Sequence, residues 1–194
     1  LFQAGWEKHY PGMILWLPPS MSGGLERIDL DTMTFHTALE NFQADAASVV
    51  PAQRAAAIAQ RTGLTDDSGW CPIVPATMHS TMDVNIHVIG DAAIANAMPK
   101  SAFAANSQAH AAALAVRRSL RGEPMQAAMY ANTCWSLVAA DDCVKVGATY
   151  TAGAQSIEST GSFISQTGEN EQIRAATARE AQAWYAGIVQ EMFA

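Results

Sequence analysis

The fold is decided by the stretch NIHVIGDAAIANAMPKS, residues 85–101. Its first five residues are apolar nearly throughout, which predicts a strand buried on both faces over 85–89. Gly90 and Asp91 end this strand, and a loop of small residues follows. Pro99 then stands where a first helical turn tolerates proline, and it predicts a long helix over 100–120. Strand, turn and helix in this order indicate an α/β fold.

The junction between this strand and this helix has the chemistry of a ligand site. An Asp at the carboxyl end of a buried parallel strand lies beside the crevice where α/β sheets bind ligands, and its carboxylate accepts hydrogen bonds from sugar or ribityl hydroxyls. The helix N-terminus favours an electron-rich or anionic group near Lys100. On spacing alone, an ordinary strand end with Asp91 as a turn residue explains the pattern equally well.

The chain on either side predicts further strands and helices. Before this stretch we expect a hairpin over 25–30 and 33–39, a strand over 46–50 and an Ala-rich helix over 51–61. The composition changes after Pro124, and there we expect strands over 130–138, 143–151 and within 156–166, then an amphipathic helix over 171–193. Residues 1–17 resemble the end of an element pair that begins elsewhere. The lack of an initiator Met or a leader before Leu1 suggests a processed chain or a fragment.

Composition and charge exclude several classes of protein. The chain has 194 residues, 49% hydrophobic and 15% charged, which suits one large or two small domains with real cores. The net charge of -7, from 18 acidic and 11 basic residues, argues against a nucleic-acid partner. No apolar run approaches the ~20 residues that span a bilayer, so we expect no membrane span.

The three cysteines leave two questions open. Cys71 lies in a loop between Trp70 and Pro72, where it is either an inert buried thiol or a redox group. Cys134 and Cys143 lie on consecutive predicted strands, so a structural disulfide between them is possible in an oxidising compartment.

No short motif for metal, hydrolase or nucleotide chemistry is present. The five histidines show no HxH, HxxxH or HExxH spacing, and we therefore expect no metal site. The sequence also lacks GxSxG, GxGxxG and Walker A motifs.

Four longer runs nevertheless resemble one family. They are VVPAQRAAAIAQRTGLTDDSGWCPI (49–73), IHVIGDAAIANAMPKSAFAANSQAHAAALAV (86–116), YANTCWSL (130–137) and AWYAGIVQEMF (183–193). Together they closely resemble the flavoprotein subunit of flavocytochrome c sulfide dehydrogenase. That family is related to sulfide:quinone reductases and, more distantly, to glutathione-reductase-like flavoenzymes.

The resemblance implies that this chain is the carboxyl-terminal half of the flavoprotein. Residues 1–42 would be the end of an inserted NAD-binding-like domain, and residues 43–122 the second half of a glutathione-reductase-like FAD-binding domain. Residues 123–194 would form a small C-terminal α+β domain, with antiparallel strands and a terminal helix, that faces a cytochrome and covers the flavin. In this family the amino-terminal half carries GxGxxG. The resemblance therefore implies that the amino-terminal half is a partner of this chain.

The resemblance also implies roles for individual residues. Cys71, in the GWCP motif, would form a redox-active disulfide beside the flavin with a cysteine of the amino-terminal half. Lys100 would stabilise the negative charge of reduced flavin, and Trp184 would lie near the isoalloxazine ring. The residues expected to bind FAD are those of the IGDA and MPKSA motifs: Gly90, Asp91, Met98, Pro99, Lys100 and Ser101.

The function implied is FAD-dependent oxidation of sulfide in the periplasm. Electrons would leave through haem c on a partner cytochrome subunit, not on this chain. Two other interpretations stay open: a non-catalytic module that binds a cytochrome without flavin chemistry, and a quinone-linked flavin reductase. The lack of an amphipathic membrane-binding tail at the carboxyl end argues against the second.

Overall fold

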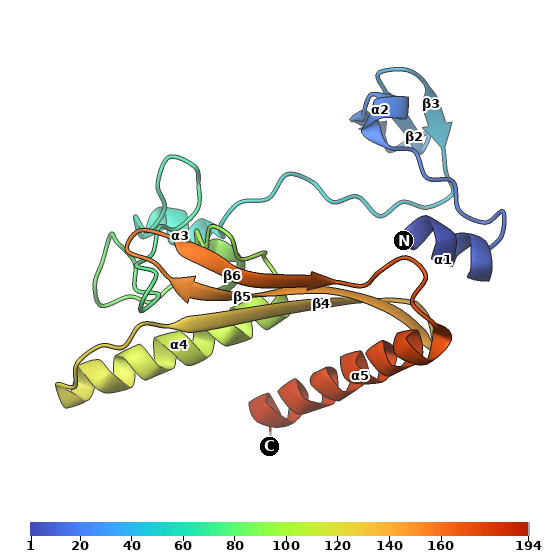
Figure 1. The fold of residues 1–194 in the computed structure, drawn as a ribbon. Helices are drawn as coiled ribbons and strands as arrows, with labels where there is room; N and C mark the ends of the chain where they lie inside the picture. The colour runs from blue at the N-terminus through green and yellow to red at the C-terminus, as the bar shows by residue number, and fades with distance from the viewer. Residues whose placement is uncertain (194) are drawn as a thin grey trace. The chain divides into compact units, whose positions relative to one another are not determined.

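The computed structural model describes residues 1–193, and the chain divides into two compact units. One comprises residues 2–53, and the other begins at Arg54 and includes Leu1. Figure 1 shows the elements of both units. The family resemblance implies three parts, each corresponding to a domain of the family. The two compact units are defined by contacts within the chain and do not test that correspondence, so the three-part division stays a prediction.

The smaller unit contains two helices and an antiparallel sheet. Helix α1 (Phe2–His9) and the single turn α2 (Pro19–Ser22) precede strands β1 (Leu25–Asp29), β2 (Thr34–Thr37) and β3 (Asn41–Gln43), which pair in the order β1-β2-β3. The predicted hairpin is confirmed. Asp29 stabilises its turn because Oδ1 accepts the backbone N–H of Asp31 at 3.0 Å and of Thr32 at 3.3 Å. β3 was not predicted.

The segment that joins the smaller sheet to the larger unit is irregular. No helix or strand forms over 44–56, so the predicted strand over 46–50 is wrong. A strand needs a neighbour for its backbone hydrogen bonds, and these residues have none within the described chain. The helix expected over 51–61 shortens to α3 (Ala57–Arg61), after which Gly63 adopts a left-handed φ of 71°.

The predicted strand over 85–89 is also wrong, although an isolated parallel bridge joins Cys71 and Ala93 nearby. Residues 64–101 form packed loops, in which His87 makes only an isolated antiparallel bridge to His79. Gly90 has a left-handed φ of 68° and opens a 3₁₀ turn, η1 (Gly90–Ala92). The apolar run makes only two backbone hydrogen bonds with the neighbouring residues 78–80, Ser80 N–H to the Ile86 carbonyl and Val88 N–H to the Met78 carbonyl, which is too few for a strand.

The long helix that follows is confirmed as α4 (Ala102–Arg121). Ser101 caps its N-terminus by accepting the N–H of Ala104 at 3.1 Å. Gly122 caps its C-terminus in the left-handed conformation, with φ 64°. Small alanines are buried along one side of α4, which lets the helix approach the sheet closely.

The C-terminal part is an antiparallel sheet with a terminal helix, as expected. Strands β4 (Met129–Ala139), β5 (Asp142–Ala152) and β6 (Ile157–Ile164) pair in the order β4-β5-β6, and α5 (Glu171–Phe193) follows. α4 packs on β4 and α5 chiefly on β5, and both helices lie on the same side of the sheet in Figure 1.

A buried ion pair fixes the start of α5 to the β4–β5 turn. Arg174 Nε donates to Asp142 Oδ1 at 2.5 Å, and Nη2 approaches the same oxygen. Both side chains are about one-tenth exposed. Removing one partner of such a pair leaves an uncompensated charge and costs about 3–5 kcal/mol.

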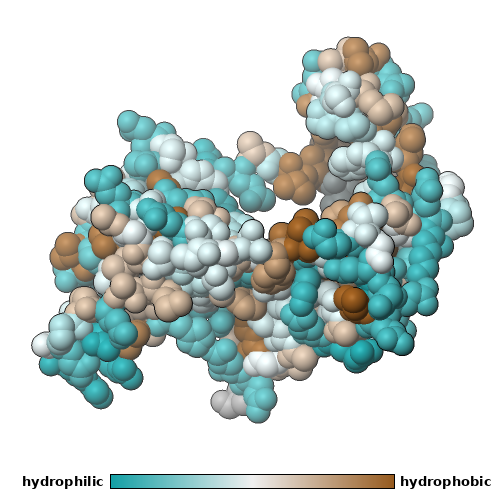
Figure 2. All heavy atoms as spheres, viewed as in Figure 1, coloured by the Kyte–Doolittle hydropathy of each residue, from teal (hydrophilic) through white to brown (hydrophobic). Residues whose placement is uncertain are grey.

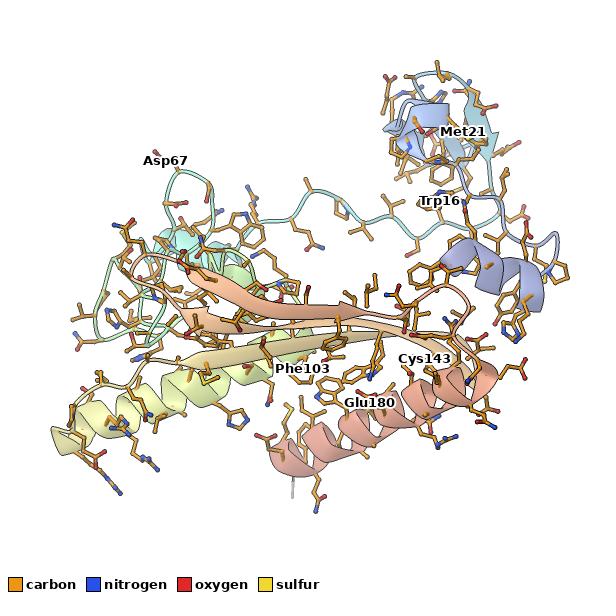
Figure 3. All side chains as sticks on the ribbon, viewed as in Figure 1. Trp16, Met21, Asp67, Phe103, Cys143 and Glu180 are labelled. Atoms are coloured by element: carbon orange, nitrogen blue, oxygen red, sulfur yellow. The ribbon has the colours of Figure 1, made fainter. Side chains whose placement is uncertain are left out.

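The structure excludes the possible Cys134–Cys143 disulfide. The register of the hairpin sets Cys143 opposite Leu137 and Cys134 opposite Val146. All three cysteines are free thiols. Cys143 is buried near Arg174 and Glu180 of α5 (Figure 3), where burial raises its pKa.

Candidate functional site

Gly90 begins the first half of the site and brings η1 against α4. Its N–H donates to Oε1 of the buried Gln108 at 2.7 Å, and Gln108 Nε2 lies 3.8 Å from the sulfur of Met98. A Cβ at Gly90 would meet the Cβ of Ala105 at 3.5 Å, and the left-handed φ disfavours any other residue. Gly90 and Met98, both predicted site residues, are therefore tied to the same helix.

Lys100 occupies the entrance to α4. Its Nζ donates to the backbone oxygens of Asp91 and, at 3.3 Å, of Ala93, and it lies 3.7 Å from the centroid of the Trp70 ring. Burial lowers the pKa of Lys100, while the charges of Asp91 and Cys71 act in the opposite direction. Asp91 is exposed, and its carboxylate makes no hydrogen bond to any residue that the structure describes.

Cys71 lies behind this group and is completely buried. Its N–H donates to the carbonyl of Ala92 at 2.9 Å, and its relative exposure is 0%. Burial raises the pKa of the Cys71 thiol, as does the charge of Asp66, whereas Lys100 lowers it. The net effect favours the neutral thiol, which is a poor nucleophile.

Ser101 connects this first half to the sheet. Its hydroxyl accepts the N–H of Ala104 and donates to Oδ1 of Asn132 on β4. Asn132 in turn donates from Nδ2 to the sulfur of Cys134 at 3.4 Å. Asn132 is 3% exposed and Cys134 is half-buried. The site therefore contains a second cysteine, which the resemblance did not single out.

Three aromatic rings form the other side of this region. Phe103, labelled on α4 in Figure 3, stacks on Trp184 of α5 with centroids 5.5 Å apart and an interplanar angle of 16°. Trp135 lies 5.5 Å from Trp184 and 5.9 Å from Phe103. They line a groove of about 300 Å³ between α4, β4 and α5, which Cys134 and Ser101 also border.

The predicted residues thus fall into two groups. Cys71, Gly90, Asp91, Met98 and Lys100 surround η1 and the entrance to α4, with Pro99 exposed between them. Trp184 belongs to the aromatic groove instead, and it packs on Phe103. Ser101 directly follows Lys100 in the chain, caps α4, donates to Asn132 and borders the groove.

The hydrogen bond between Asn132 and Cys134 was not predicted, although the sequence holds a signal for it. Residues two apart on a strand point to the same face, so an Asn-x-Cys run on a strand sets an amide beside a thiol. What the sequence lacks is the register of α4 against β4, which brings Ser101 to Asn132.

The structure also bears on two other kinds of feature, a metal site and a membrane-spanning helix. Among the described residues, no three or more His, Cys, Asp and Glu side chains gather as a metal site requires. Within residues 1–193, no helix has the length and apolar character needed to cross a bilayer.

Comparison with known families identifies the chemistry of the C-terminal part. Residues 126–193, which comprise β4, β5, β6 and α5, match the family model described as flavocytochrome c sulphide dehydrogenase, flavin-binding. This part of the chain therefore matches a C-terminal fragment of the flavoprotein subunit of flavocytochrome c sulphide dehydrogenase.

The residues at η1 and α4 fit the FAD of this family. Asp91 offers a carboxylate that no described residue occupies with a hydrogen bond, as a ribityl hydroxyl requires. Lys100 and the N-terminus of α4 supply positive charge beside it. In this family the haem is carried by the partner subunit.

Proposed function

We propose that this chain is the carboxyl-terminal part of a periplasmic sulfide dehydrogenase, which oxidises sulfide beside FAD and passes electrons to haem c on a cytochrome subunit. The match of residues 126–193 to the flavin-binding family carries this proposal. FAD, when bound, accepts two electrons and releases them one at a time. The amino-terminal half of the flavoprotein would supply the rest of the FAD site.

The electropositive groups of the chain suit an anionic substrate. Lys100 and the N-terminus of α4 attract HS⁻ and favour thiolate over thiol. In thiol-disulfide exchange, HS⁻ attacks one sulfur of a disulfide, the S–S bond breaks, and the other sulfur leaves as a thiolate. The reactive cysteine must therefore be accessible, and its thiolate must be stabilised.

The cysteine proposed for the redox disulfide is Cys71, whose partner would be a cysteine of the amino-terminal half. Burial raises the pKa of the Cys71 thiol, although the charge of Lys100 acts to lower it. Because Cys71 is fully buried, this disulfide requires the loop around it to open. Cys134 is half-buried at the edge of the aromatic groove and serves as the comparison cysteine.

Exposed apolar side chains on the sheet offer a surface for the proposed partners to bind. Leu137, Val146 and Ile164 are each about half exposed on the sheet. In Figure 2 hydrophobic surface interrupts the hydrophilic surface in the region of the sheet. Contiguous apolar surface of this kind is typical of interaction sites.

The test compares two serine variants in the reconstituted enzyme. The chain is purified with its amino-terminal complement, FAD and cytochrome c, and sulfide-dependent cytochrome reduction is followed. We expect Cys71→Ser to lower the rate at least 100-fold, because the disulfide that HS⁻ attacks, between Cys71 and a cysteine of the amino-terminal half, can no longer form. Cys134→Ser should retain most of the activity.

Each other outcome has a definite meaning. Loss of activity only in Cys134→Ser would transfer the role of reactive thiol to Cys134. Full sulfide oxidation by both variants would exclude cysteine chemistry. A wild-type assembly without flavin absorbance would favour a non-catalytic module.

A further inference from the structure

Trp70 directly precedes Cys71 in the chain and lies against the ammonium of Lys100. The indole is partly buried against the core, and Nζ of Lys100 lies 3.7 Å from the centroid of its ring. This distance is well within the roughly 6 Å over which an aromatic face attracts a cation, and tryptophan has the strongest such face. The indole therefore acts on the charge of Lys100 and is more than an apolar neighbour.

The backbone supplies the other contacts of this ammonium. Nζ donates to the carbonyl oxygen of Asp91 and, at 3.3 Å, to that of Ala93. Cys71 is hydrogen-bonded to the same segment, because its N–H donates to the carbonyl of Ala92 at 2.9 Å and its carbonyl accepts the N–H of Ile94 at 2.8 Å. The ammonium thus bridges the loop that carries the cysteine and the turn to which that loop is bonded.

We propose that Trp70 is a positioning residue, which holds the charged ammonium of Lys100 beside Cys71 at the entrance to α4. The two backbone carbonyls orient the ammonium, and the ring attracts its charge. An aliphatic side chain at position 70 would cover the ammonium but would not attract it. The inference rests on the proposed function only in giving this charge a task, the attraction of HS⁻. The placement of Lys100 does not depend on that task.

Other charges also act on Lys100. Desolvation favours its neutral form, whereas the charge of Asp91 in η1 and that of Cys71 in the preceding loop favour the protonated form. Asp66, in the same loop as Trp70, acts on Cys71. The first eight residues of α4, AFAANSQA, carry no charge. The contribution of the ring must therefore be measured while these charges and the volume of the side chain stay the same.

Fluorinated tryptophan makes that measurement possible. Each fluorine withdraws electron density from the face of the indole while the ring keeps nearly the same size, so the attraction of a cation weakens and no cavity forms. Full-length chain is produced with ordinary, monofluorinated, difluorinated or trifluorinated tryptophan and with lysine labelled by carbon-13 at Cε. The lysine signals are followed by NMR from pH 8 to pH 12. The sequence contains only three lysines, Lys8, Lys100 and Lys145, which simplifies their assignment.

The expected result is a graded shift at one lysine. We expect the pKa of Lys100 to fall with each added fluorine, by about half a unit to one unit over the series, because the charged form loses its aromatic partner. Lys145 is the internal control, since its Nζ is paired with Glu180 and lies over Phe163, a ring that the fluorination does not change. The pKa of Lys145 should stay constant.

Variants at position 70 assign the effect to one ring among the five tryptophans. In Trp70→Phe the Lys100 signal should keep part of its ring-current shift, and in Trp70→Leu it should lose that shift. In both variants the pKa of Lys100 should no longer respond to fluorine. Trp184→Leu is the matched control, because this indole packs on Phe103 and Trp135, and it should keep the response.

A Lys100 titration that is the same with and without fluorine would overturn the proposal, because a ring that merely covers the ammonium is unaffected by fluorination. A response to fluorine that persists in Trp70→Phe would overturn it too, even if Trp70→Leu did not fold. Failure of the proposed function gives a different result. If the reconstituted Cys71→Ser enzyme oxidised sulfide while Lys100 responded to fluorine, the function would be wrong and the role of Trp70 would stand.

Discussion

Burial raises the pKa of several hydroxyl and thiol groups in this protein, among them Tyr130 and Cys71. Tyr130 is 3% exposed and its phenol donates to the carbonyl of Pro75, a contact between β4 and the loops of the same unit. Burial raises the pKa of Tyr130 to about 12. Since the folded pKa exceeds the value of about 10 for an exposed tyrosine, the folded state holds this proton more tightly than the unfolded chain.

This shift predicts a pH-dependent contribution to stability. The contribution of Tyr130 is fully present below pH 10 and is lost as the pH rises toward 12. Tyr130→Phe should lower the free energy of unfolding by about 1 kcal/mol at pH 8, because the Pro75 carbonyl loses its partner. The difference between the two proteins should narrow above pH 10.

Urea unfolding at a series of pH values measures this difference. Tyr150 and the cysteines titrate in both proteins, so their effects cancel. Tyr185→Phe is the matched control, because Tyr185 is 66% exposed on α5. A constant gap between wild type and Tyr130→Phe up to pH 11.5 would contradict the prediction.

At the residue scale, the sequence indicated which residue types suit a ligand site but not which residues contact one another. Asp91 and Lys100 were expected at one ligand site, Asp91 at the end of a strand and Lys100 at the start of a helix, and Nζ of Lys100 contacts the backbone oxygen of Asp91. The link from Ser101 to Asn132 spans 31 positions and depends on how α4 packs against β4. No local pattern encodes such a packing register.

One glycine lies at the C-terminal end of a helix and another lies inside a helix, where the backbone conformation is different. Gly122 ends α4 with φ 64°, whereas Gly187 lies inside α5, and a Cβ would meet nothing within 4 Å at either position. The same substitution should therefore have opposite effects, set by backbone conformation alone.

We expect Gly122→Ala to destabilise the protein by about 1 kcal/mol, because a Cβ is strained in the left-handed region. Gly187→Ala should stabilise it by about 0.5–1 kcal/mol, since alanine loses less backbone entropy in a helix. Thermal unfolding of both variants, with Gly122→Asn as a conservative control, measures the two signs. Equal signs would show that tertiary packing outweighs backbone conformation.

Elements with local partners were predictable, and those without were not. β4 and β5 pair with each other across a short turn, and α5 was predicted with its observed bounds. Residues 46–50 have no hydrogen-bonding neighbour in the part of the chain that the structure describes, and residues 85–89 make only isolated hydrogen bonds with residues 78–80. The pattern of one segment cannot guarantee that a neighbouring strand is present.

At the scale of the whole molecule, the segment that links the two compact units is accessible to proteases. Residues 45–53 are exposed and have no helix or strand. Exposed irregular backbone is cut by proteases much faster than packed elements. Residues 46–50, AASVV, suit elastase because their side chains are small.

Brief elastase treatment should therefore cleave within 45–53 and leave a stable fragment that contains α4, the β4-β5-β6 sheet and α5. Mass spectrometry of a time course identifies the cut. A Pro substitution for Ala46 or Ala47 should slow it without changing the melting temperature. First cleavage inside α4 or the sheet would contradict the compactness of the larger unit.

The ring cluster of Phe103, Trp135 and Trp184 gives this protein an optical property. Two indoles held in fixed packing with centroids 5.5 Å apart contribute strongly to the near-ultraviolet circular dichroism, a signal that is lost when tertiary packing is lost. One indole belongs to β4 and the other to α5, so the signal requires that the terminal helix be docked. The amplitude of this band therefore reports, without label or cofactor, whether α5 covers the groove.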